Sequence, residues 1–355
     1  MDGQTGLVLA LQLIALCSIA GALLLYLLCK VRGGSINGTT QAPPVVMATG
    51  GGAAVLVTSA DTALGLQIST HLASRGYKVF AGLKDPVDSV AAKLLRNWLK
   101  AREMEMENSV NPNPSTTGTI IPLHIDVTRE DVLRESSDCV AGHLPAGERG
   151  IRGVINTAGV VHKGRVEHQD TVLWENMLRT NVLGCVRAAR VFTQLLRPTR
   201  GRFLTIGGTP TISHPQPLPS DLQQGEGLVV YSACLRAIEG LTNSLRSELG
   251  PCGVDVIQLR PDYIKAEKLY GLPQRNNVVE NRAGEQPVAQ YTASVLGPNG
   301  LRNIERALCD LRPQEFYSLA ENKKNNLLMW GGLKSPWGRK AKKNEQGTEA
   351  PTISV

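Results

Sequence analysis

The sequence lacks the cysteine patterns that build a metal site or a disulfide framework. Its seven cysteines are dispersed along 355 residues, without a CxxC pair and without a Cys/His cluster at the spacing that metal binding requires. An odd and scattered set of cysteines is typical of free thiols in a reducing compartment. We therefore expect neither a bound metal nor a disulfide-stabilised secreted protein.

The sequence also lacks the broad excess of basic residues that nucleic-acid-binding domains carry. The net charge is +7, but residues 334–343, KSPWGRKAKK, contribute five basic residues and no acid. The remainder is nearly neutral, so we expect no nucleic-acid partner. We interpret residues 334–355 as a solvated, disordered tail, with attraction of its basic run to anionic lipid headgroups as the alternative.

A basic start, which marks a cleaved signal peptide, is absent too. The chain begins MDGQTG, and residues 7–29 then form a run of 23 residues without a charge. That length suffices to span a hydrocarbon core of about 30 Å. Because Lys30 and Arg32 follow the run, the positive-inside rule places the rest of the chain in the cytosol. We predict that residues 1–32 hold a single-pass membrane anchor, in the endoplasmic reticulum or in the mitochondrial outer membrane.

After a glycine- and proline-punctuated linker at 33–52, residues 53–333 are expected to fold as one domain. Short apolar stretches alternate there with amphipathic ones. We expect strands at 54–58, 78–83, 120–127, 152–159, 202–208 and 254–261, and helices at 64–76, 89–100, 173–197, 231–249 and 301–311. Residues 103–119 predict an exposed loop. The alternation predicts a parallel sheet covered on both faces, a doubly wound α/β fold of Rossmann type that binds ligands at the carboxyl ends of its strands.

Four features in this order resemble the short-chain dehydrogenase/reductase family: NTAG at 156–159, Asn181 in TNVLG, Tyr231 at the head of a helix, and a strand ending in Arg-Pro. The resemblance covers roughly residues 53–265. The phrase ASRGYKVFAGL and the anchor are similar to the branch that holds membrane-bound steroid, retinol and hydroxybutyrate dehydrogenases. The resemblance implies NAD or NADP as cofactor. It also implies a homodimer, or a heterodimer with a relative, formed through helices 173–197 and 231–249.

The resemblance places the cofactor's pyrophosphate on a turn of the form TGxxxGxG. This chain has TSADTALG at 58–65, so Thr58 and Gly65 match while Ser59 and Ala63 replace glycines. Each replacement adds a Cβ where backbone approaches phosphate. The two changes together predict weakened dinucleotide binding.

The family's remaining cofactor contacts are kept in part. An acid at the end of the second strand is missing, because Leu83 and Lys84 occupy that region; Lys84 would favour NADP if it paired with a 2′-phosphate. After the sixth strand, Asp262 and Ala266 replace a glycine and a threonine. The positions that match, with Thr157 standing where a second asparagine is usual, are Asp126, Asn156, Ala158, Gly159 and Ile264.

The resemblance assigns catalysis to an asparagine, a serine, a tyrosine and a lysine. Asn181 and Tyr231 align, but Gly208 stands at the serine position and Leu235 at the lysine position. The tyrosine exchanges the proton while hydride moves, and the lysine lowers the phenol pKa from its usual value of about 10. Nearby groups that could substitute are Thr209 and Ser213 for the hydroxyl and Arg236 for the cation.

These departures favour a catalytically silent or weakened, membrane-anchored protein that acts by binding a lipid or steroid ligand, or a protein partner. The alternative is an active NAD(P)-dependent oxidoreductase on a steroid, retinoid or other lipid alcohol or ketone. A third hypothesis is a structural adaptor, with the fold as an inert scaffold.

Overall fold

The computed structural model describes residues 51–107, 118–207, 227–262, 264–275, 291–292 and 294–319. The predicted anchor at 7–29, nearly all of the linker and the basic tail lie outside these residues. Within the ranges just given, none of the helices combines the length and the apolar character that a membrane crossing needs.

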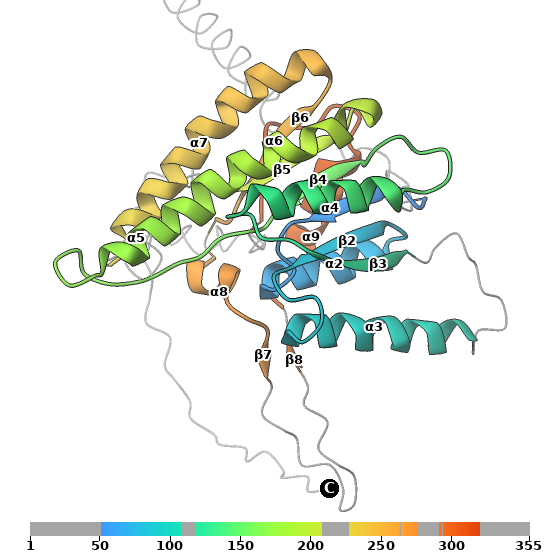
Figure 1. Ribbon diagram of the computed structural model, residues 1–355, viewed down its shortest axis with the longest axis horizontal. Coiled ribbons are helices and arrows are strands. Elements are labelled where there is room, and N and C mark those ends of the chain that lie inside the picture. Colours follow the sequence, from blue (N-terminus) through green and yellow to red (C-terminus); the bar gives the residue numbers. More distant parts are fainter. Residues whose placement is uncertain are drawn as a thin grey trace, which may run out of the picture. The chain divides into compact units, whose positions relative to one another are not determined.

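The core of the domain is a seven-stranded parallel sheet with the strand order β3-β2-β1-β4-β5-β6-β9 (Figure 1). The order reverses between β1 and β4, which makes the fold doubly wound and confirms the prediction. Most strand residues are buried, as expected for parallel strands covered on both faces. The strands are β1 (Ala54–Val57), β2 (Lys78–Leu83), β3 (Thr119–His124), β4 (Gly153–Asn156), β5 (Arg202–Ile206), β6 (Asp255–Arg260) and β9 (Phe316–Ser318).

Helices cover both faces of this sheet. On one face α2 (Ala63–Ser74), α3 (Val90–Glu107) and α9 (Pro298–Cys309) share a core cluster with alternate strand residues such as Val55 and Val57. On the other face α4 (Glu130–Gly142), α6 (Gly184–Leu196) and α7 (Val229–Leu249) pack against Ala54 and Leu56. The further elements are α5 (Thr171–Met177), α8 (Ala266–Tyr270) and the antiparallel pair β7 (Gln274–Arg275) and β8 (Tyr291–Thr292).

Two predictions about elements were wrong in detail, and other elements were missed. The helix expected at 173–197 is α5 and α6 joined by a π-helical segment, Leu178–Leu183. Helix α3 runs to Glu107, so the first residues of the predicted loop at 103–119 are helical, because its Met and Glu residues are strong helix formers. Helix α4 and strand β9 were missed altogether.

We predict that Gly65→Ala lowers the free energy of unfolding by about 1–3 kcal/mol, measured by urea denaturation. A Cβ at Gly65 would lie 1.8 Å from the carbonyl oxygen of Ser59, so the turn after β1 would have to shift. The matched control is Gly240→Ala within α7, where a Cβ meets nothing within 4 Å. The control should gain up to about 1 kcal/mol from helix propensity. Equal stability of the two variants would contradict the close approach at Gly65.

Candidate functional site

The carboxyl ends of β1 and β4 are joined by a network of hydrogen bonds. The Thr58 hydroxyl donates to Asn156 Oδ1 at 2.8 Å, and the Thr157 amide donates to Thr58 Oγ1 at 3.1 Å. The Ser59 amide donates to Thr157 Oγ1 at 3.1 Å, and that hydroxyl donates to the Ser59 carbonyl at 3.0 Å. The structure thus brings these predicted residues together. Thr157, a departure from the family pattern, holds the first turn in place.

The N-terminus of α2, where the fold would place a phosphate, is already bonded by the chain itself. Thr62 caps the helix, accepting a hydrogen bond from the Gly65 amide at 3.1 Å. The Ala63 amide donates to the carbonyl of Gly271 at 2.8 Å. An anion at this helix end would have to compete with both contacts.

Tyr270, the last residue of α8, lies against Gly159. A Cβ on Gly159 would meet Tyr270 Cε1 at 2.3 Å, which shows how closely the ring covers this glycine. The ring also packs edge-to-face on Tyr231, with centroids 6.2 Å apart and an interplanar angle of 76°. The Tyr231 and Tyr270 hydroxyl groups share a hydrogen bond. The sequence analysis missed Tyr270, because no local motif brings α8 to the end of β4.

Tyr231 and Leu235 lie in one apolar cluster. They are 4% and 5% exposed and pack with Met177, Cys234 and Ala266. Burial, followed by the neighbouring Tyr270, raises the pKa of the Tyr231 phenol far above its usual range. Burial likewise raises the pKa of Tyr270 to about 12. Both phenols are therefore protonated at neutral pH.

Asn181 lies in the π-helical segment and is buried. Its Nδ2 donates to the Val160 carbonyl at 2.8 Å, and its Oδ1 accepts from the Val160 amide at 2.7 Å. Both ends of the side-chain amide thus hold the chain that follows β4. This role is structural and holds whether or not the protein catalyses a reaction.

An acid that the sequence analysis missed reaches the end of β2. The Lys84 amide donates to Asp61 Oδ2 at 2.8 Å. Asp61 belongs to the turn after β1, and burial is the largest influence raising its pKa. The second strand contributes no acid of its own, but Asp61 places a carboxyl group beside its end. The signal was an acid inside the TSADTALG turn, which local spacing alone does not connect to β2.

Asp126 is fixed by its own turn. Its Oδ1 accepts from the Thr128 amide at 2.9 Å and from the Thr128 hydroxyl at 2.8 Å. Burial alone would raise the pKa of Asp126, but these hydrogen bonds outweigh it and hold the pKa below its usual value. The carboxylate is therefore preformed at the end of β3.

Some of the remaining candidates lie outside the described residues, and the others lie at the surface or in the core. Gly208, Thr209 and Ser213 lie outside the described residues. The Arg236 side chain is 63% exposed and pairs with Glu239 at 3.4 Å. Partly buried Ala158 and Ile264 pack against the two core clusters, and burial raises the pKa of Asp262, which accepts a hydrogen bond from Ser318. Across the described part of the chain, no three His, Cys, Asp or Glu residues gather as metal ligands would.

A family model described as short chain dehydrogenase matches residues 53–276. The chain belongs to this family. Among curated short-chain dehydrogenases, the mitochondrial D-beta-hydroxybutyrate dehydrogenase of Bos taurus is 25% identical over 269 residues, covering 75% of this chain and 69% of the relative. Estradiol 17-beta-dehydrogenase 2 of Rattus norvegicus is 24% identical over 288 residues, covering 74% and 67%. For the Rattus norvegicus hydroxybutyrate dehydrogenase, the chain spans 61% of the relative's length.

Among solved structures, a short-chain dehydrogenase/reductase from Serratia marcescens BCRC 10948 is 20% identical, covering 60% of this chain and 75% of that one, with a TM-score of 0.46. The curated relatives place the chain in the steroid and hydroxybutyrate branch of the short-chain dehydrogenases. This family generally uses NAD or NADP.

We predict that Tyr231→Phe and Tyr270→Phe each lower the free energy of unfolding by about 1 kcal/mol, since each removes the same buried hydrogen bond. The double variant should cost little more than either single one, because residues in contact are coupled. Urea denaturation of the four proteins measures the coupling. Tyr77→Phe, which loses a hydroxyl contact with Cys309 elsewhere, should add fully to Tyr270→Phe. Full additivity for Tyr231 and Tyr270 would contradict their hydrogen bond.

Proposed function

We propose that this protein is a catalytically silent member of the short-chain dehydrogenase family that acts by binding a partner or a lipid ligand at a membrane. In this proposal residues 7–29 anchor the chain in the endoplasmic reticulum or the mitochondrial outer membrane, with the domain in the cytosol. The single observation that carries the proposal is the position of Tyr270 and Gly271 at the carboxyl edge of the sheet.

These two residues stand where the family pattern expects a dinucleotide. Gly159 should lie beneath the cofactor, but the Tyr270 ring covers it. The first turn of α2 should meet the pyrophosphate, but the Ala63 amide is bonded to Gly271. A dinucleotide would therefore have to displace α8 from both ends of its site.

The groups that would transfer a proton are also altered, independently of the contacts that α8 makes in the cleft. Leu235 takes the place of the cation that would lower the pKa of Tyr231, and the surrounding cluster is apolar. General acid–base catalysis contributes about 10²–10⁴-fold to a rate, and a phenol with a raised pKa contributes little of it. Weakened cofactor binding and the absence of a cation beside Tyr231 both support a catalytically silent protein.

A second candidate is an active oxidoreductase on a lipid alcohol or ketone. It is favoured by Tyr231 and Asn181, which both stand at the carboxyl edge, and by relatives named for hydroxybutyrate and estradiol. This candidate requires α8 to leave the cleft when NAD or NADP binds. The two candidates therefore differ in whether the unsubstituted protein binds a dinucleotide.

We expect 1 mM NAD⁺, NADH, NADP⁺ or NADPH to leave the melting temperature of the full-length protein in detergent unchanged. Saturation at 100 times Kd would add about 2.7 kcal/mol of stability and raise the melting temperature visibly. Tyr270→Ala should gain dinucleotide affinity, because it removes the ring over Gly159. The matched control is Leu272→Ala, an exposed position in the same segment. A shift in the unsubstituted protein would instead support the oxidoreductase.

The surface available for a partner is the outer side of α5, the π-helical segment, α6 and α7. Figure 1 shows α5 and α6 following one another as one long helical run with α7 alongside it, and α7 contacts both α5 and the π-helical segment. Large apolar side chains are exposed along these elements, namely Val172, Leu178, Leu183, Val186 and Val229. Their exposure supports pairing with a second chain of the same fold, either a copy or a relative.

We predict that Leu183→Gln with Val186→Gln weakens this pairing, because both exposed side chains would be buried in a dimer. Loss of this buried apolar surface should raise the dimer dissociation constant at least about tenfold. Sedimentation equilibrium of the full-length protein in detergent, alone and mixed with a family relative, measures the change. Val87→Gln with Val90→Gln, exposed positions near α3, is the control. An unchanged dimer would contradict this interface.

A further inference from the structure

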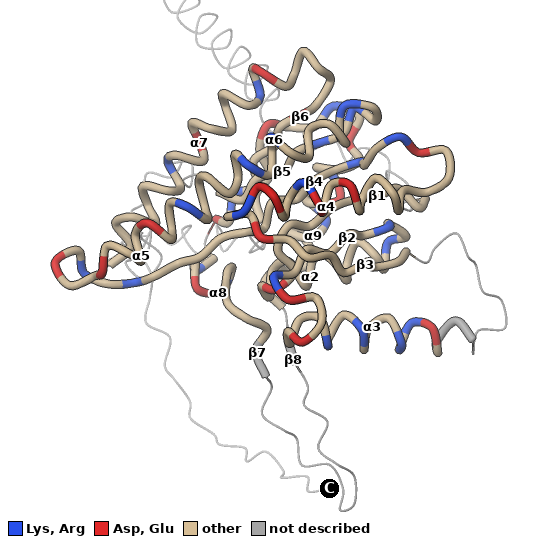
Figure 2. Tube along the Cα trace, in the orientation of Figure 1, with Lys and Arg blue, Asp and Glu red and all other residues tan. Residues whose placement is uncertain are grey.

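The loops that lead into the amino ends of the strands carry a concentration of basic side chains. Figure 2 shows Lys and Arg recurring near the start of β2, in the loop before β4 and at the end of α6. None of these side chains forms an ion pair with another described residue. We call them the amino-end face: Lys78, Arg149, Arg152, Arg197, Arg200 and Arg312.

The acids of the same loops are mostly neutralised. Asp255 pairs with Arg202 at 3.7 Å, Asp310 with Arg306 at 3.3 Å, and Glu315 with Arg246 at 3.4 Å. Among the described residues of these loops, Glu148 is the acid outside any ion pair. The amino-end face therefore carries a clear positive excess.

The opposite end of the sheet has the reverse balance. In the described loops that follow the strands, acids outnumber basic residues. The acids are Asp61, Asp85, Asp88, Asp126, Glu167, Asp170 and Asp262. The basic residues are Lys84, Arg129, Lys163, Arg165 and Lys265. The chain as a whole is nearly neutral outside its tail. Among the described loops, the positive excess thus lies at the amino end of the sheet.

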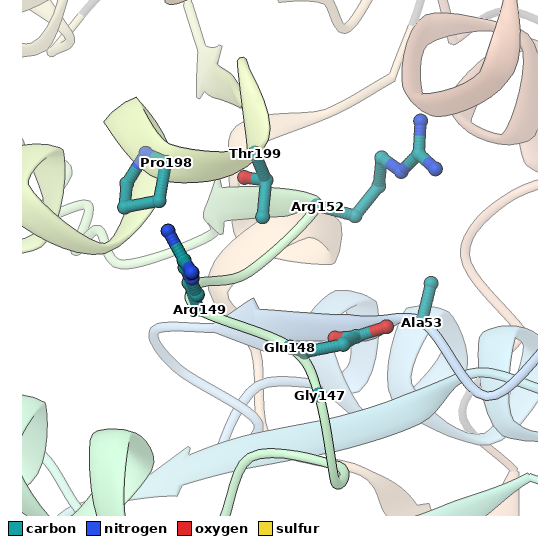
Figure 3. Close-up of a pocket in the computed structure, with 7 residues that line it drawn as sticks. All are labelled: Ala53, Gly147, Glu148, Arg149, Arg152, Pro198 and Thr199. Carbon is teal, nitrogen blue, oxygen red and sulfur yellow. The ribbon is translucent and has the colours of Figure 1, made fainter.

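A hollow of about 310 Å³ lies within the amino-end face, lined by Ala53, Gly147, Glu148, Arg149, Arg152, Pro198 and Thr199. Figure 3 shows the guanidinium groups of Arg149 and Arg152 extending in different directions, with Arg149 beside Pro198 and Glu148 reaching toward Ala53. The two cations do not converge on one point. This arrangement suits a layer of many anions better than a single bound ion.

The chain enters the domain at this same face. Strand β1 begins at Ala54, and the Gly52 amide donates to the Gly76 carbonyl at 3.0 Å, next to Lys78. The proposed anchor ends at residue 29, so about 24 residues separate it from β1. A flexible chain of that length has an end-to-end distance of roughly 25–30 Å. An anchor would therefore hold the amino-end face near the membrane.

We propose that the amino-end face docks on the anionic lipid headgroups of the membrane that holds the anchor. The nearness of the amino-end face to the membrane depends on the proposed anchor, whereas the positive charge of this face does not. Each basic residue near an anionic surface strengthens attraction about fivefold. The attraction weakens with salt, because the Debye length falls from about 10 Å at 0.1 M to about 3 Å at 1 M.

The test compares the full-length protein in lipid nanodiscs of neutral phosphatidylcholine and of phosphatidylcholine with phosphatidylserine. Hydrogen exchange of backbone amides is followed in the loops at 143–152 and 197–201. We expect exchange there to slow at least about fivefold in the anionic discs and to recover in high salt. The variant R149Q/R152Q/R197Q/R200Q should lose the slowing. The matched control K163Q/R165Q/K265Q/K268Q, at the opposite end, should keep it.

Equal exchange in both kinds of disc, or slowing that survives the four arginine substitutions, would overturn the docking. The second result would assign the attraction to the basic tail at 334–343. Failure of the anchor gives a different result, since the protein would then not be retained in neutral discs. In that case, salt-dependent binding to anionic discs that the arginine variant loses would still support the docking surface.

Discussion

The packing of α8 against the carboxyl edge of the sheet is the contact on which the function of this cleft depends. Tyr270 covers Gly159 and shares a hydrogen bond with Tyr231, while Gly271 accepts one from the Ala63 amide. These contacts fasten one short segment to β4, α7 and α2 at once. The family resemblance places a dinucleotide against the same elements, so the proposed function has this segment and a cofactor competing for one position.

The family residues at this edge have structural roles that do not depend on catalysis. Thr58 and Asn156 form a buried hydrogen bond with each other, and the Asn181 side-chain amide bonds the Val160 backbone through both its oxygen and its nitrogen. Losing either partner would leave a buried polar group unpaired, at a cost of about 1–3 kcal/mol. Gly65 is fixed by its approach to Ser59. The lysine that the family pattern expects at position 235, where this chain has Leu235, would have no comparable structural role.

The same distinction separates what the sequence could predict from what it could not. The buried strands were predictable, because parallel strands are continuous apolar runs, and β2 matches residue for residue. Thr58 and Asn156 were predicted as site residues, but their hydrogen bond was not, because it depends on the strand order that brings β1 and β4 side by side. Tyr270 and Asp61 were missed, because each reaches its partner through tertiary packing. The π-helical segment around Asn181 was also missed, since apolar periodicity does not distinguish it from an α-helix.

The two ends of the sheet differ in the charge of their described loops. The carboxyl edge, where this fold binds ligands, is closed by the chain's own α8 and carries more acids than bases in its described loops. The described loops of the amino edge are basic, and β1 enters the sheet there. In the proposed function the cleft is needed for packing alone, whereas a surface that meets a membrane needs its positive charge. The distribution of charge therefore supports the proposal that this protein acts through the amino-end face and not through the cleft at the carboxyl edge.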